Sequence, residues 1–169
     1  GLLILFSLIW MIHLRRQVIL RTGIQRQLDD QLTLLRQIVD GTPFPVWLRD
    51  QHGALTYCNQ RYLAETASDW LHVKGTTLLE YQGNLTKGDA VAAHHLLQQV
   101  IENGKARFED RDYQRHHQNG EQEKCTVFQW LQPWLDSEGN TCGVMGGWMD
   151  ISNRQALLLE LREMRDKAE

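Results

Sequence analysis

The 169-residue sequence is poor in the residues that cross-link or interrupt a chain, with three cysteines and three prolines. The cysteines, Cys58, Cys125 and Cys142, form an odd and widely spaced set without a CxxC pair. They indicate neither a disulfide framework nor a zinc site, and they fit reduced thiols in the cytosol. The chain also lacks excess positive charge, since its formal net charge is −3. No nucleic-acid partner is therefore expected.

Catalytic signatures are missing as well. The sequence has no phosphate-binding glycine loop, no H-E-x-x-H motif and no nucleophile elbow, so we expect no catalytic residue and no metal site in this chain. The glycine-rich stretch at residues 143–147 falls inside a predicted strand and does not open a helix. We expect it to permit close backbone approach within a sheet rather than to bind phosphate.

A single long hydrophobic run, GLLILFSLIWMIHL, occupies residues 1–14. It is shorter than the ~20 residues that span a bilayer, so it fits the end of a membrane helix, a signal-peptide core or a buried helix. A signal peptide carries its positive charges before the apolar run, whereas Arg15 and Arg16 follow this one. We therefore expect residues 1–14 to be the end of a truncated transmembrane helix. The positive-inside bias places the chain from about Arg15 onward in the cytoplasm.

Two further helical segments flank a central region. Residues 15–41 carry one apolar stripe that predicts a linker helix, which Gly41 should end in a left-handed turn. This stripe fits either packing on the following domain or a parallel two-helix coil. Residues 152–169 begin with Ser152 and Gln155 at capping-box spacing and continue as a heptad seam. We expect a coiled-coil signalling helix there, and a homodimer that forms through both flanking helices.

The central region, residues 42–151, alternates between strand and helix patterns. Strands are predicted at 46–49 and 55–58, a short helix at 60–66 capped by Asn59, and a longer helix at 89–102. Further strands are predicted at 106–113, 123–134 and 141–151. Because short turns join these last three strands, they must be antiparallel. The fold class is therefore α+β, a five-stranded antiparallel sheet with its helices inserted between strands 2 and 3.

That strand order resembles a PAS domain over residues 42–151, with Asn59 after the second strand and Gly147-Trp148-Met149-Asp150-Ile151-Ser152 at the close. The stretches Gln27–Gln31 and Gly41–Pro43 are similar to the unorthodox virulence sensor kinases of the BvgS/EvgS type. The resemblance implies the sensing and relay module of a two-component sensor histidine kinase in the bacterial inner membrane. Its phosphorylated histidine would lie outside this chain. A diguanylate cyclase or a chemoreceptor could carry the same module.

The resemblance also suggests two groups of site residues. Asp150, Ser152 and Arg154 match the element that couples a PAS sheet to its outgoing helix, and Asn59 marks the other end of the domain. Simple helix capping is the alternative reading for these residues. The second group would line a cavity that holds a small metabolite, and its candidate residues are Cys58, Tyr62, His94, Cys125 and Trp130. A purely structural spacer without a ligand is a third hypothesis.

No cofactor is predicted. Haem-binding PAS sensors place their iron ligand in the helix that holds His94 and His95, and His94 is the one with a suitable orientation. We favour histidines at the rim, because His95 points away from the buried face. A quinone remains an option by analogy with related kinases, as does redox sensing by the cysteines. His116 and His117 are expected in a solvated hairpin turn.

Overall fold

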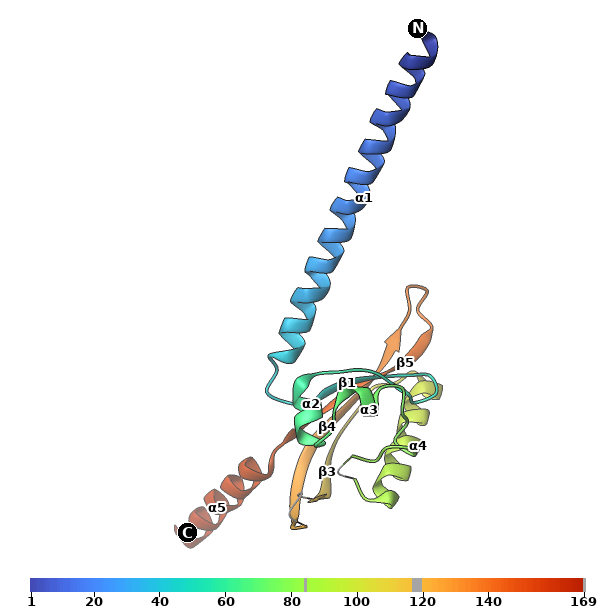
Figure 1. Ribbon diagram of the computed structural model, residues 1–169. Helices are drawn as coiled ribbons and strands as arrows, with labels where there is room; N and C mark the ends of the chain where they lie inside the picture. The colour runs from blue at the N-terminus through green and yellow to red at the C-terminus, as the bar shows by residue number, and fades with distance from the viewer. Residues whose placement is uncertain (84, 117–119, 169) are drawn as a thin grey trace. The chain divides into compact units, whose positions relative to one another are not determined.

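The computed structural model describes residues 1–83, 85–116 and 120–168 (Figure 1). The chain divides into two compact units, Gly1–Gly41 and Thr42–Glu169. The order of elements is one helix, two strands, three helices, three strands and a final helix.

The first unit is a single helix, α1, Leu2–Asp40, none of whose residues is buried. Its 39 residues correspond to about 58 Å at ~1.5 Å per residue, which is more than the hydrocarbon core of a bilayer. By length and composition this helix could cross a membrane. The predicted left-handed ending is wrong, because Gly41 has φ −76° and ψ −8°. The amide of Gly41 donates to the carbonyls of Gln37 and Val39, and Pro43 then prevents further helical hydrogen bonding.

The second unit is built on one five-stranded sheet with the order β2-β1-β5-β4-β3. Its strands are β1 Val46–Asp50, β2 Leu55–Cys58, β3 Arg107–His116, β4 Gln122–Leu135 and β5 Thr141–Asp150. Every pairing is antiparallel, which confirms the predicted fold class. The last strand is central, since it pairs with β1 on one side and with β4 on the other.

Three helices lie between β2 and β3 in the sequence, as predicted: α2 Gln60–Glu65, α3 Trp70–Val73 and α4 Lys87–Asn103. Figure 1 shows them together over one face of the sheet. Side chains from these helices and from that face form the hydrophobic core, which includes Trp47, Leu55, Val73, Leu97, Leu131 and Val144. The core holds the helices against β1, β4 and β5, so any cavity between these layers has a fixed wall.

Glycines of β5 allow this close packing. A Cβ atom on Gly143 would overlap the carbonyl oxygen of Arg49, and one on Gly146 would overlap the Trp47 ring. The prediction that residues 143–147 permit close approach in the sheet is confirmed. After β5 a single residue leads into α5, Ser152–Ala168, whose described side chains beyond the first residue are exposed.

Candidate functional site

A cavity of about 110 Å³ lies between the helices and the sheet of the second unit. Its wall combines side chains from α2 and α4 with side chains from β1, β3, β4 and β5. Trp47, Tyr62 and Trp148 contribute aromatic surface, and Tyr62 and Trp148 are in edge-to-face contact with ring centroids 5.6 Å apart. The cavity is therefore small and has a largely aromatic and aliphatic wall.

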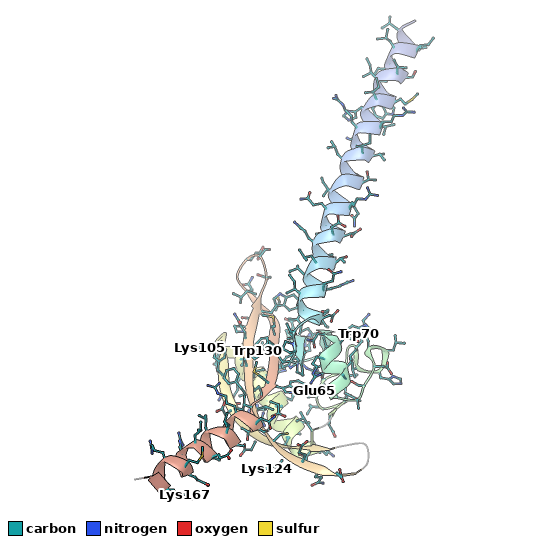
Figure 2. The ribbon with its side chains drawn as sticks, turned by 90° about the vertical axis from the view of Figure 1, so that its left-hand side faces the viewer. Glu65, Trp70, Lys105, Lys124, Trp130 and Lys167 are labelled. Carbon is teal, nitrogen blue, oxygen red and sulfur yellow. The ribbon has the colours of Figure 1, made fainter. Side chains whose placement is uncertain are left out.

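Of the five predicted cavity residues, Tyr62 lines this cavity. Cys58 and Cys125 are buried but are not among its wall residues. Trp130 of β4, labelled in Figure 2, pairs with Gly147 of β5 and covers it. The neighbouring Leu131 belongs to the core. Because side chains alternate along a strand, Trp130 is on the sheet face opposite the helices and cannot reach the cavity.

His94 also lies away from the cavity wall, in α4 against Gly53 of the β1–β2 turn. Its Nδ1 atom is buried without a hydrogen-bond partner in the described structure. Desolvation, followed by the positive charges of Arg49 and His95, lowers the pKa of His94. His95 is exposed, as predicted.

Haem does not fit this arrangement. His94 does not line the cavity, and the volume of about 110 Å³ is below the ~300 Å³ at which pockets for drug-sized ligands begin. The part of the chain that the structure describes also holds no group of three or more histidine, cysteine or acidic side chains that could bind a metal. The backbone of His116 ends β3, and His117 lies outside the described residues, so their predicted turn is not described.

The sequence interpretation missed Arg49, which is 2% exposed. Its Nη1 atom donates to the carbonyl oxygens of Gly53 and Thr76, each at 2.9 Å, and its Nη2 atom donates to the Tyr62 hydroxyl at 3.2 Å. The guanidinium also lies 5.5 Å from the centroid of a Trp47 ring. One signal was available: Arg49 is two residues after Trp47 in a short strand and therefore shares its inward face.

Burial raises the pKa of Tyr62, and the charge and the hydrogen bond of Arg49 partly oppose this shift. The phenol therefore stays protonated at neutral pH. Because arginine has no acceptor, the Tyr62 oxygen accepts the hydrogen bond from Arg49 and keeps its own proton for another partner.

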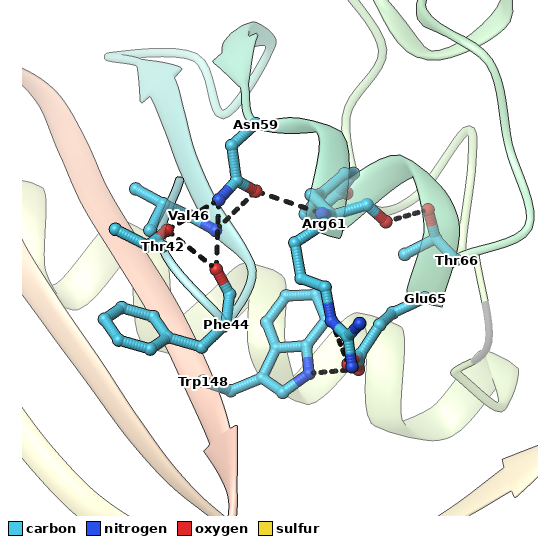
Figure 3. A network of polar contacts seen from close by, with 9 residues as sticks. Thr42, Phe44, Val46, Asn59, Arg61, Glu65, Thr66 and Trp148 are labelled. Carbon is cyan, nitrogen blue, oxygen red and sulfur yellow. Dashed lines mark hydrogen bonds and ion pairs between the residues drawn. The ribbon is translucent and has the colours of Figure 1, made fainter. Parts of the chain in front are cut away.

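A fully buried side chain, Asn59, joins the start of the sheet to the start of α2 (Figure 3). Its Oδ1 accepts from the amides of Val46 and Tyr62, both at 3.0 Å. Its Nδ2 donates to the Thr42 hydroxyl at 2.9 Å and to the Phe44 carbonyl at 3.0 Å. The predicted helix cap is confirmed. Asn59 also fixes residues 42–45, which we name the incoming segment.

The far end of α2 connects to β5. Glu65 accepts a hydrogen bond from the Trp148 indole nitrogen at 3.3 Å and pairs with Arg61 at 3.1 Å (Figure 3). Trp148 is two residues before Asp150, where β5 ends. Polar contacts at the two ends of the short helix α2 therefore connect the incoming segment to the last residues of the central strand, β5.

The last strand passes into α5 at residues 150–152, which we name the outgoing junction. The Ser152 hydroxyl accepts from the Thr126 amide of β4 at 2.9 Å, and the Ile151 amide donates to the Thr126 carbonyl at 2.9 Å. Asp150 accepts from the Ser152 amide at 3.0 Å. Ser152 thus bonds to the sheet. The Gln155 side chain of the predicted capping box lies outside the described residues. Arg154 is exposed.

The sheet order and the inserted helices are those of a PAS domain. A solved PAS domain from Bordetella pertussis BvgS is 34% identical, with a TM-score of 0.64 over 82% of this chain and 98% of that one. The chain belongs to the PAS domain family. At 22% identity, a structure of VqmA bound to DPO matches 72% of this chain and 56% of that one with a TM-score of 0.57, a likeness that shows the fold alone.

Within that family the chain resembles one kind of sensor. It is 37% identical over 98% of its length to the virulence sensor protein BvgS of Bordetella parapertussis and, to the same extent, to that of Bordetella pertussis. It spans 13% of the length of these curated relatives. No family model matches the sequence. The chain is therefore a PAS sensor module similar to that of BvgS.

Proposed function

We propose that this PAS module belongs to a membrane-bound, homodimeric histidine kinase of the bacterial inner membrane. In this proposal the module relays a signal from the incoming segment to α5. The similarity to BvgS over nearly the whole chain supports the kinase context. The phosphorylated histidine and the ATP-binding site would lie in other parts of the parent protein.

Membrane attachment is supported by α1. The helix begins with the apolar residues 1–14, and its length of 39 residues exceeds what a bilayer requires. Arg15 and Arg16 follow the apolar part and favour a cytoplasmic position for the rest of the chain.

Dimerisation is supported by α5, where Leu157, Leu161 and Met164 repeat at spacings of four and three residues and are about half exposed. Large apolar side chains at heptad positions favour a partner helix, because burying each contributes roughly 1.5–3 kcal/mol. A second copy of α5 in a parallel coil is the arrangement we propose.

The polar connection through α2 is the observation that carries the relay. Asn59 holds the incoming segment at the first turn of α2, and Glu65 holds Trp148 at its last turn. A shift of the incoming segment would therefore move both ends of α2 and bias the outgoing junction. Such a relay needs two arrangements of similar free energy, so that a coupling of about 1–3 kcal/mol changes their populations.

The test uses the full-length parent protein in membranes and measures transfer of the ATP γ-phosphate to the protein itself. Trp148→Phe removes the indole N–H that bonds Glu65 and retains an aromatic ring. Trp134→Phe, at a half-exposed position near the end of β4, is the matched control. We expect Trp148→Phe to change autophosphorylation several-fold with little change in melting temperature, and Trp134→Phe to leave both unchanged.

Equal autophosphorylation in the two variants would contradict the relay through α2. A parent protein that does not autophosphorylate would contradict the kinase context and point to a cyclase or a chemoreceptor as the output.

A further inference from the structure

Arg49 places a positive charge inside the domain, and no counter-ion for it is present among the described residues. Its side chain is 2% exposed, and within the described residues no carboxylate forms an ion pair with it. Arginine cannot shed its proton in a protein, so burial does not neutralise it. An isolated buried charge is costly, and the carbonyls of Gly53 and Thr76 compensate only part of that cost.

The hydrogen bonds of Arg49 leave donors available at the cavity. Three of its five N–H groups have acceptors in the described structure, namely the two carbonyls and the Tyr62 oxygen. The Tyr62 hydroxyl proton has no acceptor there either. Both side chains line the cavity. An acceptor with negative charge is the group that complements this pair of donors.

The acidic residues of the cavity wall are engaged elsewhere. Glu65 pairs with Arg61 and accepts from Trp148. Asp89 accepts from the Thr86 hydroxyl at 2.7 Å in the first turn of α4. Among the described residues neither forms an ion pair with Arg49.

The size and wall of the cavity limit what could bring that charge. A volume of about 110 Å³ is somewhat less than the ~150 Å³ of a cavity that holds benzene. Trp47, Tyr62 and Trp148 supply flat apolar surface around it. A ligand with a single anionic group on a small planar body matches both properties.

We propose that the cavity binds a small planar monocarboxylate, whose carboxylate pairs with Arg49 and accepts the Tyr62 hydroxyl proton. This inference rests on the proposed sensory function and names the ligand class of that module. A bound carboxylate would neutralise Arg49 and contact α2 through Tyr62, which lies between the two polar connections of that helix. Occupancy of the cavity would in this way bias the same relay.

The experiment uses the 169-residue chain in detergent micelles, with acetate as the probe and acetamide as its neutral, isosteric control, because both are smaller than benzene and suit a cavity of about 110 Å³. Binding is followed by NMR through the indole N–H resonance of Trp148. We expect acetate to shift this resonance saturably and to bind at least tenfold more tightly than acetamide, because only acetate supplies the missing charge.

Tyr62→Phe is the informative variant, because it retains the ring in the core and removes only the hydroxyl. It should weaken acetate binding about tenfold, the value of one charge-assisted hydrogen bond, and leave acetamide binding within about twofold. Tyr57→Phe in β2, outside the cavity wall, is the matched control and should bind acetate like the original protein.

Three results would overturn the proposal: equal affinities for acetate and acetamide, no acetate binding up to about 10 mM, or unchanged acetate affinity in Tyr62→Phe. None of them bears on the phosphorylation difference between Trp148→Phe and Trp134→Phe, so failure of the ligand class and failure of the relay are distinguishable.

Discussion

The two ends of the PAS domain are fastened to the sheet in different ways. Asn59 is fully buried at the incoming segment and uses both its oxygen and its nitrogen, each for two hydrogen bonds. At the outgoing junction Ser152 is half-buried and bonds to Thr126 of a single neighbouring strand. The incoming side is thus built into the core, whereas the outgoing side is held by few contacts at the surface. We infer that the outgoing junction is the part that changes arrangement.

The largest expected effect is on the incoming side. Asn59→Ala removes the acceptor of the Val46 and Tyr62 amides, so the free energy of unfolding should fall by about 2–4 kcal/mol. Chemical denaturation of the whole chain in micelles measures this loss. Asn153→Ala, at an exposed position in the first turn of α5, is the control and should stay within ~0.5 kcal/mol. A similar loss in both variants would remove the distinction between the two ends.

A smaller stability effect is expected at the outgoing junction. Ser152→Ala should lower the free energy of unfolding by about 1 kcal/mol, because the hydroxyl loses the bond that it accepts from the Thr126 amide and the longer bond that it donates to the Thr126 carbonyl. Autophosphorylation of the full-length protein should nevertheless change several-fold, because α5 loses its bond to the sheet. Ser137→Ala in the exposed β4–β5 turn is the control and should change neither quantity.

Asp150→Ala should cost still less stability, about 0.5–1 kcal/mol, because this exposed carboxylate caps the first turn of α5. Its effect on autophosphorylation should exceed its effect on the melting temperature. An intact fold with unchanged autophosphorylation would assign Asp150 to helix capping alone.

The smallest effect is a change in pH dependence. The pKa of His94 is lowered, so below its ordinary value of about 6.5 the unfolded chain binds a proton that the folded chain does not. The free energy of unfolding should therefore fall as the pH drops below about 6.5. In His94→Gln the free energy of unfolding should depend less on pH below about 6.5. Asn59→Ala and Ser152→Ala should lower the free energy of unfolding equally at every pH, because neither side chain ionises. A changed pH dependence in either variant would show that the incoming segment or the outgoing junction is coupled to His94.

The sequence predicted those elements of the fold that depend on local patterns. The strands β1 and β4, the turn at Gly139 and the cap at Asn59 all have local signals, and each is confirmed. The central position of β5 has no such signal, because Val46 and Gly147 pair across about 100 residues. The resemblance to PAS domains, rather than any local pattern, indicated the overall arrangement of the sheet.

The candidate site was predicted less completely for the same reason. Tyr62 lines the cavity and Ser152 bonds to the sheet, yet Trp130 alternates to the far face of the sheet and Arg49 was overlooked in a short strand. Whether an arginine is buried depends on distant carbonyls such as that of Thr76, 27 residues away. Ser152 likewise bonds to a distant residue, Thr126, which lies 26 residues earlier in the sequence. The capping-box spacing had indicated a partner within the helix that Ser152 begins.

The central claim is that the incoming segment and the outgoing junction are energetically coupled through α2. It is tested most directly by a double-mutant cycle of Thr42→Val and Ser152→Ala in the full-length protein, read out as autophosphorylation. Thr42→Val removes the hydroxyl that accepts from Asn59, whereas Ser152→Ala removes the hydroxyl that bonds to Thr126 of β4. We predict that the double variant departs several-fold from the product of the single effects, and that Trp148→Phe abolishes this departure. Single effects that simply multiply would contradict the account.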